Sequence, residues 1–173
     1  TQIIFNKVIV SEDRSIREVV GLRPYRHSGF VVQHERIGNK DVIHNYGHGG
    51  AGISLCWGTS HLAVEKAMML PHRDCAVLGC GVVGLTTATL MQRKGYKVTI
   101  YAKDLPPETT SNIAAGKWTP RPAFNQGFIT PEFYQDFLSA THLSYRYYQD
   151  MVGSYYGVRW IKNYIFGDEP IEF

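Results

Sequence analysis

Three glycines near the middle of the chain have the spacing of a phosphate-binding turn. They are Gly79, Gly81 and Gly84, and a short apolar segment, Cys75 to Leu78, comes directly before them. Glycine at the first place permits a tight turn, and at the second it lets a pyrophosphate approach the backbone. At the third place it lets a helix pack closely on a strand. The first N–H groups of such a helix have no partner within the helix and therefore favour an anion.

The surrounding residues predict a β–α–β unit. Residues 85–94 contain few strong helix breakers and end at Gly95, and the alternating segment Tyr96 to Ala102 predicts a second strand. A strand before the glycines and another after the helix make the unit of about 30 residues that a dinucleotide fingerprint requires. We therefore predict that an adenine dinucleotide binds here. The alternative is that the turn needs glycine only for its own geometry.

Two residues compete for the ribose of this dinucleotide. A dinucleotide site usually has an acidic residue at the end of the second strand, where it binds the ribose hydroxyls. Here Lys103 holds that place and Asp104 follows it. Asp104 can take the role of the acid, or the ribose can depend on backbone groups. Lys103 also leaves NADP open as the ligand, because a cation at this place accommodates a 2′-phosphate.

A second glycine cluster, Gly47 to Gly52, also lies between a strand and a helix. Segments 29–37 and 41–46 predict two strands joined by a turn, and a helix is predicted from about Ile53 to Leu70, before Pro71. The apolar residues of this helix cover more than one face, so we expect it to be buried on most sides. Its positive end would stabilise negative charge that develops on a ligand.

Composition bounds the classes of function. The chain has 173 residues, 44% of them hydrophobic and 13% aromatic, which suits one ordinary domain, or one domain and part of another. A net charge of +3 without a long basic run predicts no nucleic acid partner. The cysteines lie in apolar surroundings and predict small buried side chains instead of disulfides. A strand-to-loop change separates His44 from His48, so no metal site is predicted.

No membrane segment is predicted either. Residues 75–92 are uncharged and long enough to cross a bilayer, but their glycines and threonines fit a strand, a turn and a helix. The first residues, Thr1 to Phe5, do not have the anatomy of a signal peptide. We expect a soluble protein and leave its compartment open. It is cytoplasmic, or periplasmic if a leader has been removed.

The last third of the chain predicts a loop at 119–129, one long helix and one strand. Thr130 suits the N-cap and Pro131 the first residue of a helix that should end near Gly153. A strand is predicted from Val158 to Phe166. The helix residues expected to face the core, as packing and not as chemistry, are Tyr134, Leu138, Thr141, Tyr145, Tyr148 and Val152.

Four segments together resemble one family, the FAD-dependent D-amino-acid oxidases. They are Val20–Pro24, Val42–Gly50, Val77–Gly84 and Tyr101–Trp118, and the resemblance covers most of residues 16–120. Each segment alone is a modest signal, and four in one chain with matching internal spacing are a strong one.

The resemblance implies an α/β fold. It consists of a Rossmann-like FAD-binding domain with a parallel sheet, residues 1–118, and the beginning of an α+β substrate domain, residues 119–173. Residues 16–45 would contribute partly to the substrate side. In the usual family member the GxGxxG segment opens the chain and the segments that match Val20–Pro24 and Val42–Gly50 close it. Here the order is reversed, which resembles a circular permutation.

The family's central portion has no counterpart in this chain. That portion supplies most of the substrate-binding sheet and the active-site tyrosines. We therefore expect an incomplete sheet, which missing sequence or another chain would complete.

The resemblance implies FAD as the cofactor and assigns residues to it. The positions that match the pyrophosphate loop are Gly79, Gly81, Val82, Val83 and Gly84. The positions that match residues lining the phosphates and the flavin are Thr109, Thr110, Ser111, Ala115, Gly116 and Lys117. The positions that match the segment beside the isoalloxazine ring are Gly49, Gly50, Ala51, Gly52, Ile53 and Ser54. Lys103 and Asp104 stay the candidates for the ribose.

The resemblance also implies a reaction, the oxidation of the CH–NH2 group of a D-amino acid by hydride transfer to flavin N5. Molecular oxygen then reoxidises the flavin and forms H2O2. Pro24 holds Arg23 extended, which suits an arginine that reaches toward a site, but this stretch alone favours an ordinary surface arginine. In the family its place belongs to the arginine that binds the substrate carboxylate, and the carbonyl of Gly50 would receive the amine. An NADP-dependent reductase and a non-catalytic flavin-binding fragment are the alternatives.

Overall fold

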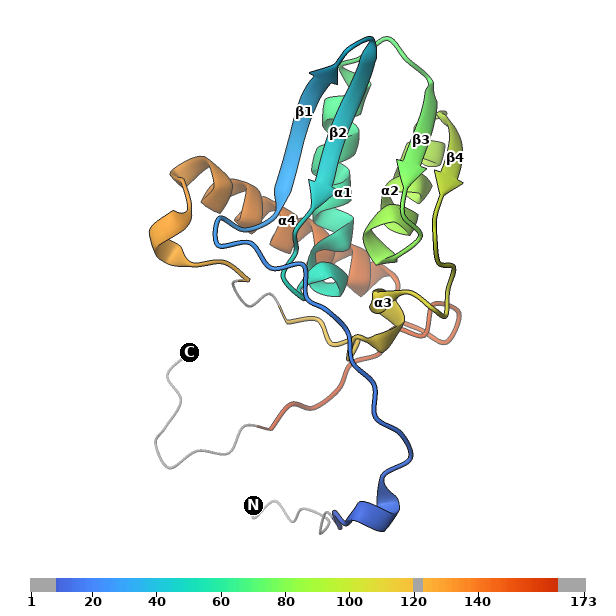
Figure 1. Ribbon diagram of the computed structural model, residues 1–173, viewed down its shortest axis with the longest axis vertical. Helices are drawn as coiled ribbons and strands as arrows, with labels where there is room; N and C mark the ends of the chain where they lie inside the picture. Colours follow the sequence, from blue (N-terminus) through green and yellow to red (C-terminus); the bar gives the residue numbers. More distant parts are fainter. Residues whose placement is uncertain (1–8, 120–122, 165–173) are drawn as a thin grey trace.

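The computed structural model describes residues 9–119 and 123–164, which form a mixed α/β fold (Figure 1). Its strands and main helices, in chain order, are β1 (Val31–Ile37), β2 (Lys40–Tyr46), α1 (Gly52–Met68), β3 (Asp74–Leu78), α2 (Val82–Arg93), β4 (Lys97–Tyr101), α3 (Thr110–Ile113) and α4 (Pro131–Asp150). Two short 3-10 turns, η1 (Glu12–Arg14) and η2 (Gln126–Phe128), complete the order.

The strands form two separate sheets. β1 and β2 are an antiparallel hairpin in which Val31 is opposite Tyr46, and Gly38 takes a φ of +57° in the turn between them. β3 and β4 are parallel, and α2 forms the connection that a parallel pair requires. The predicted hairpin and the predicted β–α–β unit are therefore both confirmed. Among the described residues, each of the two sheets has two strands.

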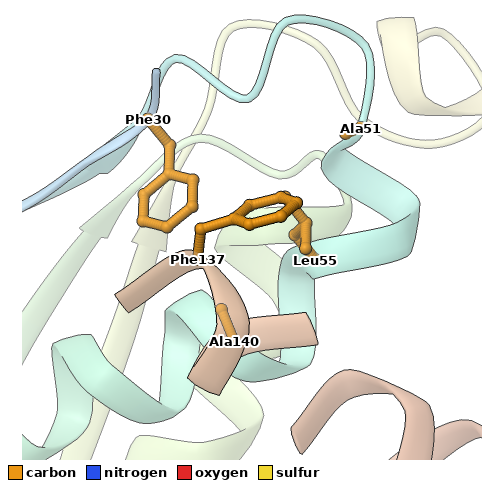
Figure 2. Packing of buried hydrophobic residues seen from close by; sticks show 5 residues of the cluster. All are labelled: Phe30, Ala51, Leu55, Phe137 and Ala140. Carbon is orange, nitrogen blue, oxygen red and sulfur yellow. The ribbon is translucent and has the colours of Figure 1, made fainter. Parts of the chain in front are cut away.

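Helix α1 is the centre of the molecule and is buried on most sides, as predicted. It packs against α2, α4 and both strands of the hairpin. Figure 2 shows one end of this core, where the rings of Phe30 and Phe137 approach Leu55 below the start of α1. The other end joins α1 to α2 and β4 through the buried residues Val64, Ala67, Leu90, Met91 and Tyr96.

Helix α4 begins as predicted, and its core-facing line agrees in part with the prediction. The Thr130 side chain accepts a hydrogen bond from Phe133 N at 3.2 Å and caps the first turn. The fully buried residues of α4 are Phe137, Ala140 and Ser144. The predicted core line was partly wrong, because Tyr134 is 45% exposed and Val152 lies beyond the helix end.

Close contact between α1 and α4 explains which residues of α4 are buried. A Cβ atom at Gly58 would overlap the backbone of Ala140, and Gly58 N donates to Ser144 Oγ at 2.8 Å. The helices approach each other most closely where side chains are smallest, so Ala140 and Ser144 are buried at the crossing.

The predicted strand from Val158 to Phe166 is wrong over its described part. Residues 158–164 form no strand, and only isolated bridges join Val158 to Val152 and Gly153. A strand needs a partner for its backbone groups, and the described residues offer Val158 alone such a partner. Residues 165 and 166 lie outside the described part of the chain.

Two classes of feature are absent from the described residues. None of their helices has the length and apolar character needed to cross a lipid bilayer. Residues 9–119 and 123–164 also hold no group of three or more histidine, cysteine, aspartate or glutamate side chains placed to bind a metal ion.

Candidate cofactor-binding site

The turn between β3 and α2 has the geometry that its glycine spacing predicts. Gly79 has a φ of +111°, which favours glycine, and its N–H donates to the carbonyl of Tyr101 at 2.8 Å. A Cβ atom at Gly84 would collide with the carbonyl of Gly79 and lie 3.6 Å from Val77 Cγ1. The third glycine therefore lets α2 pack against the strand before it.

A serine hydroxyl from α3 lies at the start of α2. Val82 N donates to Ser111 Oγ at 2.8 Å, and a Cβ atom at Gly81 would lie 3.0 Å from the same oxygen. Gly81 is the N-cap residue and has no side chain that can cap the helix, so Ser111 supplies the acceptor. An electronegative atom already sits at this helix end, which is the place that an anion would favour.

The turn between β2 and α1 contains three glycines with positive φ, Gly47, Gly49 and Gly50. A Cβ atom at Gly50 would overlap the guanidinium of Arg23, and Gly49 N donates to the carbonyl of Pro24 at 3.1 Å. The structure thus brings Arg23 directly onto Gly50, the two residues that were predicted to act together.

The two helix starts are neighbours. A Cβ atom at Gly52 would lie 3.7 Å from Val82 Cγ1 and 3.9 Å from Val83 Cγ2. Further along, α1 and α2 share the cluster of Val64, Ala67, Leu90 and Met91, so the helices run in the same direction. Val82 and Val83 lie beside Gly52, between the first turns of the two helices.

Residues 115–119 lie beside the start of α1. Ser54 Oγ accepts a hydrogen bond from Thr119 N at 2.9 Å and lies 3.1 Å from the carbonyl of Thr119. The carbonyl of Lys117 is 3.4 Å from the same hydroxyl, while Lys117 Nζ donates to Asn163 at 2.8 Å. The three predicted groups of residues, 49–54, 79–84 and 109–117, therefore meet in one region of the molecule.

Other predicted residues are at the margin of this region. Lys103 and Asp104 are exposed and follow the carboxyl end of β4. Gly79 follows the carboxyl end of β3, which lies beside it in the parallel pair. Ala115 and Gly116 are exposed too, and Gly116 has a φ of +69°. Thr109 is buried and is the N-cap residue of α3. Its Oγ1 donates to Asn112 Oδ1 at 2.8 Å, so the hydroxyl is bonded within that short helix.

His48 belongs to the α1 turn and has a role that its sequence position does not reveal. Its side chain is stacked on Phe30 with ring centroids 5.7 Å apart, and its Nε2 lies 2.9 Å from Thr59 Oγ1. The residue is only 4% exposed, and burial lowers the pKa of His48 to about 4. The imidazole is therefore neutral at pH 7 and attaches the glycine turn to α1.

Tyr148 supports the same helix start from α4. Its hydroxyl donates to the carbonyl of Ile53 and lies 3.5 Å from Cys56 Sγ. Burial raises the pKa of Tyr148 and also that of Cys56. Both groups stay protonated at neutral pH, which agrees with packing and not with acid–base chemistry.

A cavity of about 380 Å³ lies away from these turns, towards the far ends of α1 and α2. Its lining includes Val64, Met68, Leu90 and Tyr147, and none of the predicted site residues. The candidate site is instead the surface of two helix ends and the turns that lead into them.

Comparison with known proteins identifies the family. The family model described as "FAD dependent oxidoreductase" matches residues 74–163, which is more than half of the chain. The chain belongs to this family of FAD-dependent oxidoreductases. FAD is accordingly its cofactor, as predicted, and the NADP alternative receives no support from the match.

Individual relatives match over shorter stretches. The D-amino-acid oxidase of Dictyostelium discoideum is 50% identical over 52 residues, which cover 29% of this chain and 15% of that protein. The D-aspartate oxidase of Homo sapiens is 50% identical over 60 residues, 32% of this chain and 16% of that protein. The D-amino-acid oxidase of Streptomyces coelicolor is 37% identical over 54 residues, 31% of this chain and 17% of that protein. No solved structure matches the chain significantly.

The residues present fit an FAD group. Two helix starts side by side present positive dipole ends, and Gly79, Gly81 and Gly84 place no side chain at their positions where β3 leads into α2. The matched stretches nevertheless span only 15% to 17% of these relatives' own lengths.

Proposed function

We propose that the complete protein oxidises the CH–NH2 group of a D-amino acid. Bound FAD supplies the hydride acceptor at N5 and, once reduced, the electrons that convert O2 to H2O2. Membership of the FAD-dependent family and the names of the relatives, D-amino-acid oxidase and D-aspartate oxidase, support this proposal. The observation that carries it is the placement of the Arg23 guanidinium on Gly50, at the start of α1.

Arg23 would bind the substrate carboxylate. A guanidinium presents two parallel N–H donors that match a carboxylate, which a lysine cannot do. The adjacent carbonyl of Gly50 would accept a hydrogen bond from the substrate amine. Together these two groups would orient the substrate, and the reaction needs no side chain of this chain as a general base.

The two helix starts would share the cofactor. The backbone N–H of Val83 would bind the pyrophosphate, and that of Val82 would do so by exchanging its bond to Ser111 Oγ, with Thr109, Thr110 and Ser111 beside the phosphates. Residues Gly49 to Ser54 would lie along the flavin ring, where the positive end of α1 stabilises negative charge. Ala115 to Lys117 would line the flavin from the other side, and Lys103 or Asp104 would approach the ribose.

We also propose that the chain is circularly permuted relative to its family. Residues 1–118 would form the Rossmann-like FAD-binding domain, with residues 16–45 partly on the substrate side, and residues 119–173 would lead into the substrate domain. The contact between Gly52 and Val82 supports this arrangement, because it joins a segment that closes the usual family member to the one that opens it. Missing sequence or another chain would complete the sheet, and the 81% exposure of Leu78 on β3 agrees with an uncovered face.

The decisive experiment is the absorbance spectrum of the complete purified protein under anaerobic conditions. We expect a yellow protein whose flavin bands bleach when a D-amino acid is added and return with O2. D-alanine and D-aspartate should be tested separately as a neutral and an acidic substrate, because the relatives include a D-amino-acid oxidase and a D-aspartate oxidase. A colourless protein that binds NADP would contradict the proposal.

Arg23 provides the test of the substrate site. Arg23→Lys keeps the charge but loses the two-pronged geometry, so we expect KM for the D-amino acid to rise about 10- to 100-fold with FAD still bound. Arg17→Ala, at an exposed position of the same segment, is the matched control and should leave KM unchanged. Equal KM values for the wild type and Arg23→Lys would exclude this role for Arg23.

A second candidate function is a non-catalytic flavin-binding module. The observation in its favour is that the matched stretches span 15% to 17% of these relatives' lengths. It predicts a yellow protein whose flavin bands no D-amino acid bleaches in the absence of oxygen. The same spectrum therefore separates the two candidates.

A further inference from the structure

The side-chain amide of Asn45 joins three elements of the fold. Asn45 is the residue before the last of β2, and its Nδ2 donates to Ser60 Oγ on α1 at 3.3 Å and to Thr87 Oγ1 on α2 at 3.1 Å. Asn45 lies inside the segment Val42–Gly50 that resembles the oxidase family, but the resemblance assigns it no role. It lies just before the glycine turn that leads into α1.

The two hydroxyls complete a hydrogen-bond network with this amide. Ser60 Oγ and Thr87 Oγ1 are 2.8 Å apart, and Thr87 Oγ1 donates to the carbonyl of Val83 at 2.8 Å. With Thr87 donating to Val83 and Ser60 donating to Thr87, each hydroxyl still accepts one hydrogen of the Asn45 NH2 group. Every hydrogen of the network therefore has an acceptor.

The carbonyl end of the same amide is unpaired. Asn45 Oδ1 is buried, and it has no hydrogen-bond partner among the described residues. An unpaired buried acceptor is unfavourable in itself. The favourable contribution of Asn45 thus comes from the two bonds of its NH2 group, and these bonds are directed at the two helices.

The network acts at the place where helix spacing affects the helix starts. Val83 belongs to the first turn of α2, and Ser60 is fully buried in α1. The same pair of helices meets at Gly52 and Val82, where their first turns are neighbours. A change at Ser60 or Thr87 would rotate or separate the helices and displace one first turn relative to the other.

We infer that Asn45 is a positioning residue for the cofactor, which holds the starts of α1 and α2 at the separation that a single FAD requires. The inference rests on the proposed assignment of FAD to both helix starts. The hydrogen bonds of the Asn45 side chain go to residues within α1 and α2 and to none of the predicted cofactor-binding residues. It acts through Ser60 and Thr87.

Variants of the complete protein test this role through FAD affinity and the visible spectrum of the bound flavin. Asn45→Ala removes both bonds, and Thr87→Val removes one acceptor with little change of shape. We expect each to raise the Kd for FAD about tenfold and to shift the flavin bands. Thr87→Ser restores the hydroxyl and should return Kd to within about twofold of the wild type.

Thr89→Val is the matched control. Thr89 also lies on α2 and donates to the carbonyl four residues before it, Leu85, at 2.8 Å, but its hydrogen bond is exposed and makes no link to α1. This variant should keep the wild-type Kd and spectrum. The unfolding free energy of each apoprotein is measured in parallel, so that a general loss of stability is recognised.

Two results would overturn the inference. In the first, Asn45→Ala and Thr87→Val lower the unfolding free energy but bind FAD with the wild-type Kd and spectrum. In the second, Thr89→Val weakens FAD binding as much as Thr87→Val does. A wild-type protein that binds no FAD would instead overturn the proposed function, and this inference with it.

Discussion

Each of the two glycine turns of this molecule would present a helix start to the cofactor in the proposed site, but the turns are built differently. In the β3–α2 turn the decisive contact is local, because a Cβ atom at Gly84 would meet the carbonyl of Gly79 within the same turn. In the β2–α1 turn the contacts come from afar. Gly50 lies under Arg23, and His48 reaches Thr59 in the middle of the helix.

This difference explains why one turn is recognisable from its spacing and the other only from its surroundings. A local collision depends on a few residues, so it produces a short fixed pattern. Contacts with distant segments leave no fixed spacing. The two turns should accordingly fail in different ways when they are changed.

The largest effect is expected at Gly84. Gly84→Ala places a Cβ against the backbone of Gly79, which cannot move aside as a side chain would, so we expect a loss of about 3 kcal/mol in unfolding free energy and no FAD binding. Denaturant unfolding and flavin absorbance measure the two effects. On helix propensity alone, alanine at position 84 would raise the unfolding free energy by about 1 kcal/mol. A variant more stable than the wild type would therefore show that α2 is not tightly packed on the backbone of Gly79.

The α1 turn should be sensitive to acid through His48. Its pKa in the folded protein, about 4, is below the ordinary value of 6.5, so the unfolded chain takes up the proton first as the pH falls. The stabilising contribution is complete above pH 6.5 and is lost between pH 6.5 and 4, by roughly 3 kcal/mol in total. Unfolding free energies measured across this range should show the decline.

His48→Gln removes the titrating group, and the decline should become smaller by that amount. His44→Gln changes a histidine of β2 whose Nε2 is paired with Glu35 at 2.8 Å, and serves as the control. If His48→Gln has the same pH dependence as the wild type, the buried imidazole does not cause the decline.

Alanine at the positive-φ glycines should distinguish the turns by function. Gly50 and Gly79 have φ values of +95° and +111°, so alanine at either costs about 1–2 kcal/mol in backbone strain. The added Cβ meets Arg23 at Gly50 but nothing within 4 Å at Gly79. We expect Gly50→Ala to raise KM for the D-amino acid, and Gly79→Ala to leave KM unchanged with some loss of FAD affinity. Steady-state kinetics with excess FAD separates these outcomes.

The smallest effect is expected at Ser111. Ser111→Ala removes the acceptor for Val82 N and should lower the unfolding free energy of the apoprotein by about 1 kcal/mol. Thr110→Ala, in the same short helix, changes a residue without this bond and is the comparison. Equal stability of both variants would show that the cap contributes nothing.

The sequence by itself determined the β–α–β unit, the hairpin, the start of α4 and the FAD-dependent family, because each depends on local patterns. The spacing of Gly79, Gly81 and Gly84 predicts a turn, and Thr130 followed by Pro131 predicts a helix start. It also predicted that Arg23 and Gly50 act together, although only through resemblance to a family.

Only the tertiary structure decided which residues of α4 are buried and that residues 158–164 form no strand. It also decided that Asn45 bonds Thr87, His48 bonds Thr59 and Ser111 bonds Val82. Each of these depends on which segment lies opposite. Ala140 and Ser144 are buried because α1 crosses α4 there, at Gly58. Residues 158–164 form no strand because Val158 pairs only with Val152 and Gly153, in isolated bridges. Packing between segments distant in the chain leaves no spacing rule in the sequence, since the partner can come from any part of it.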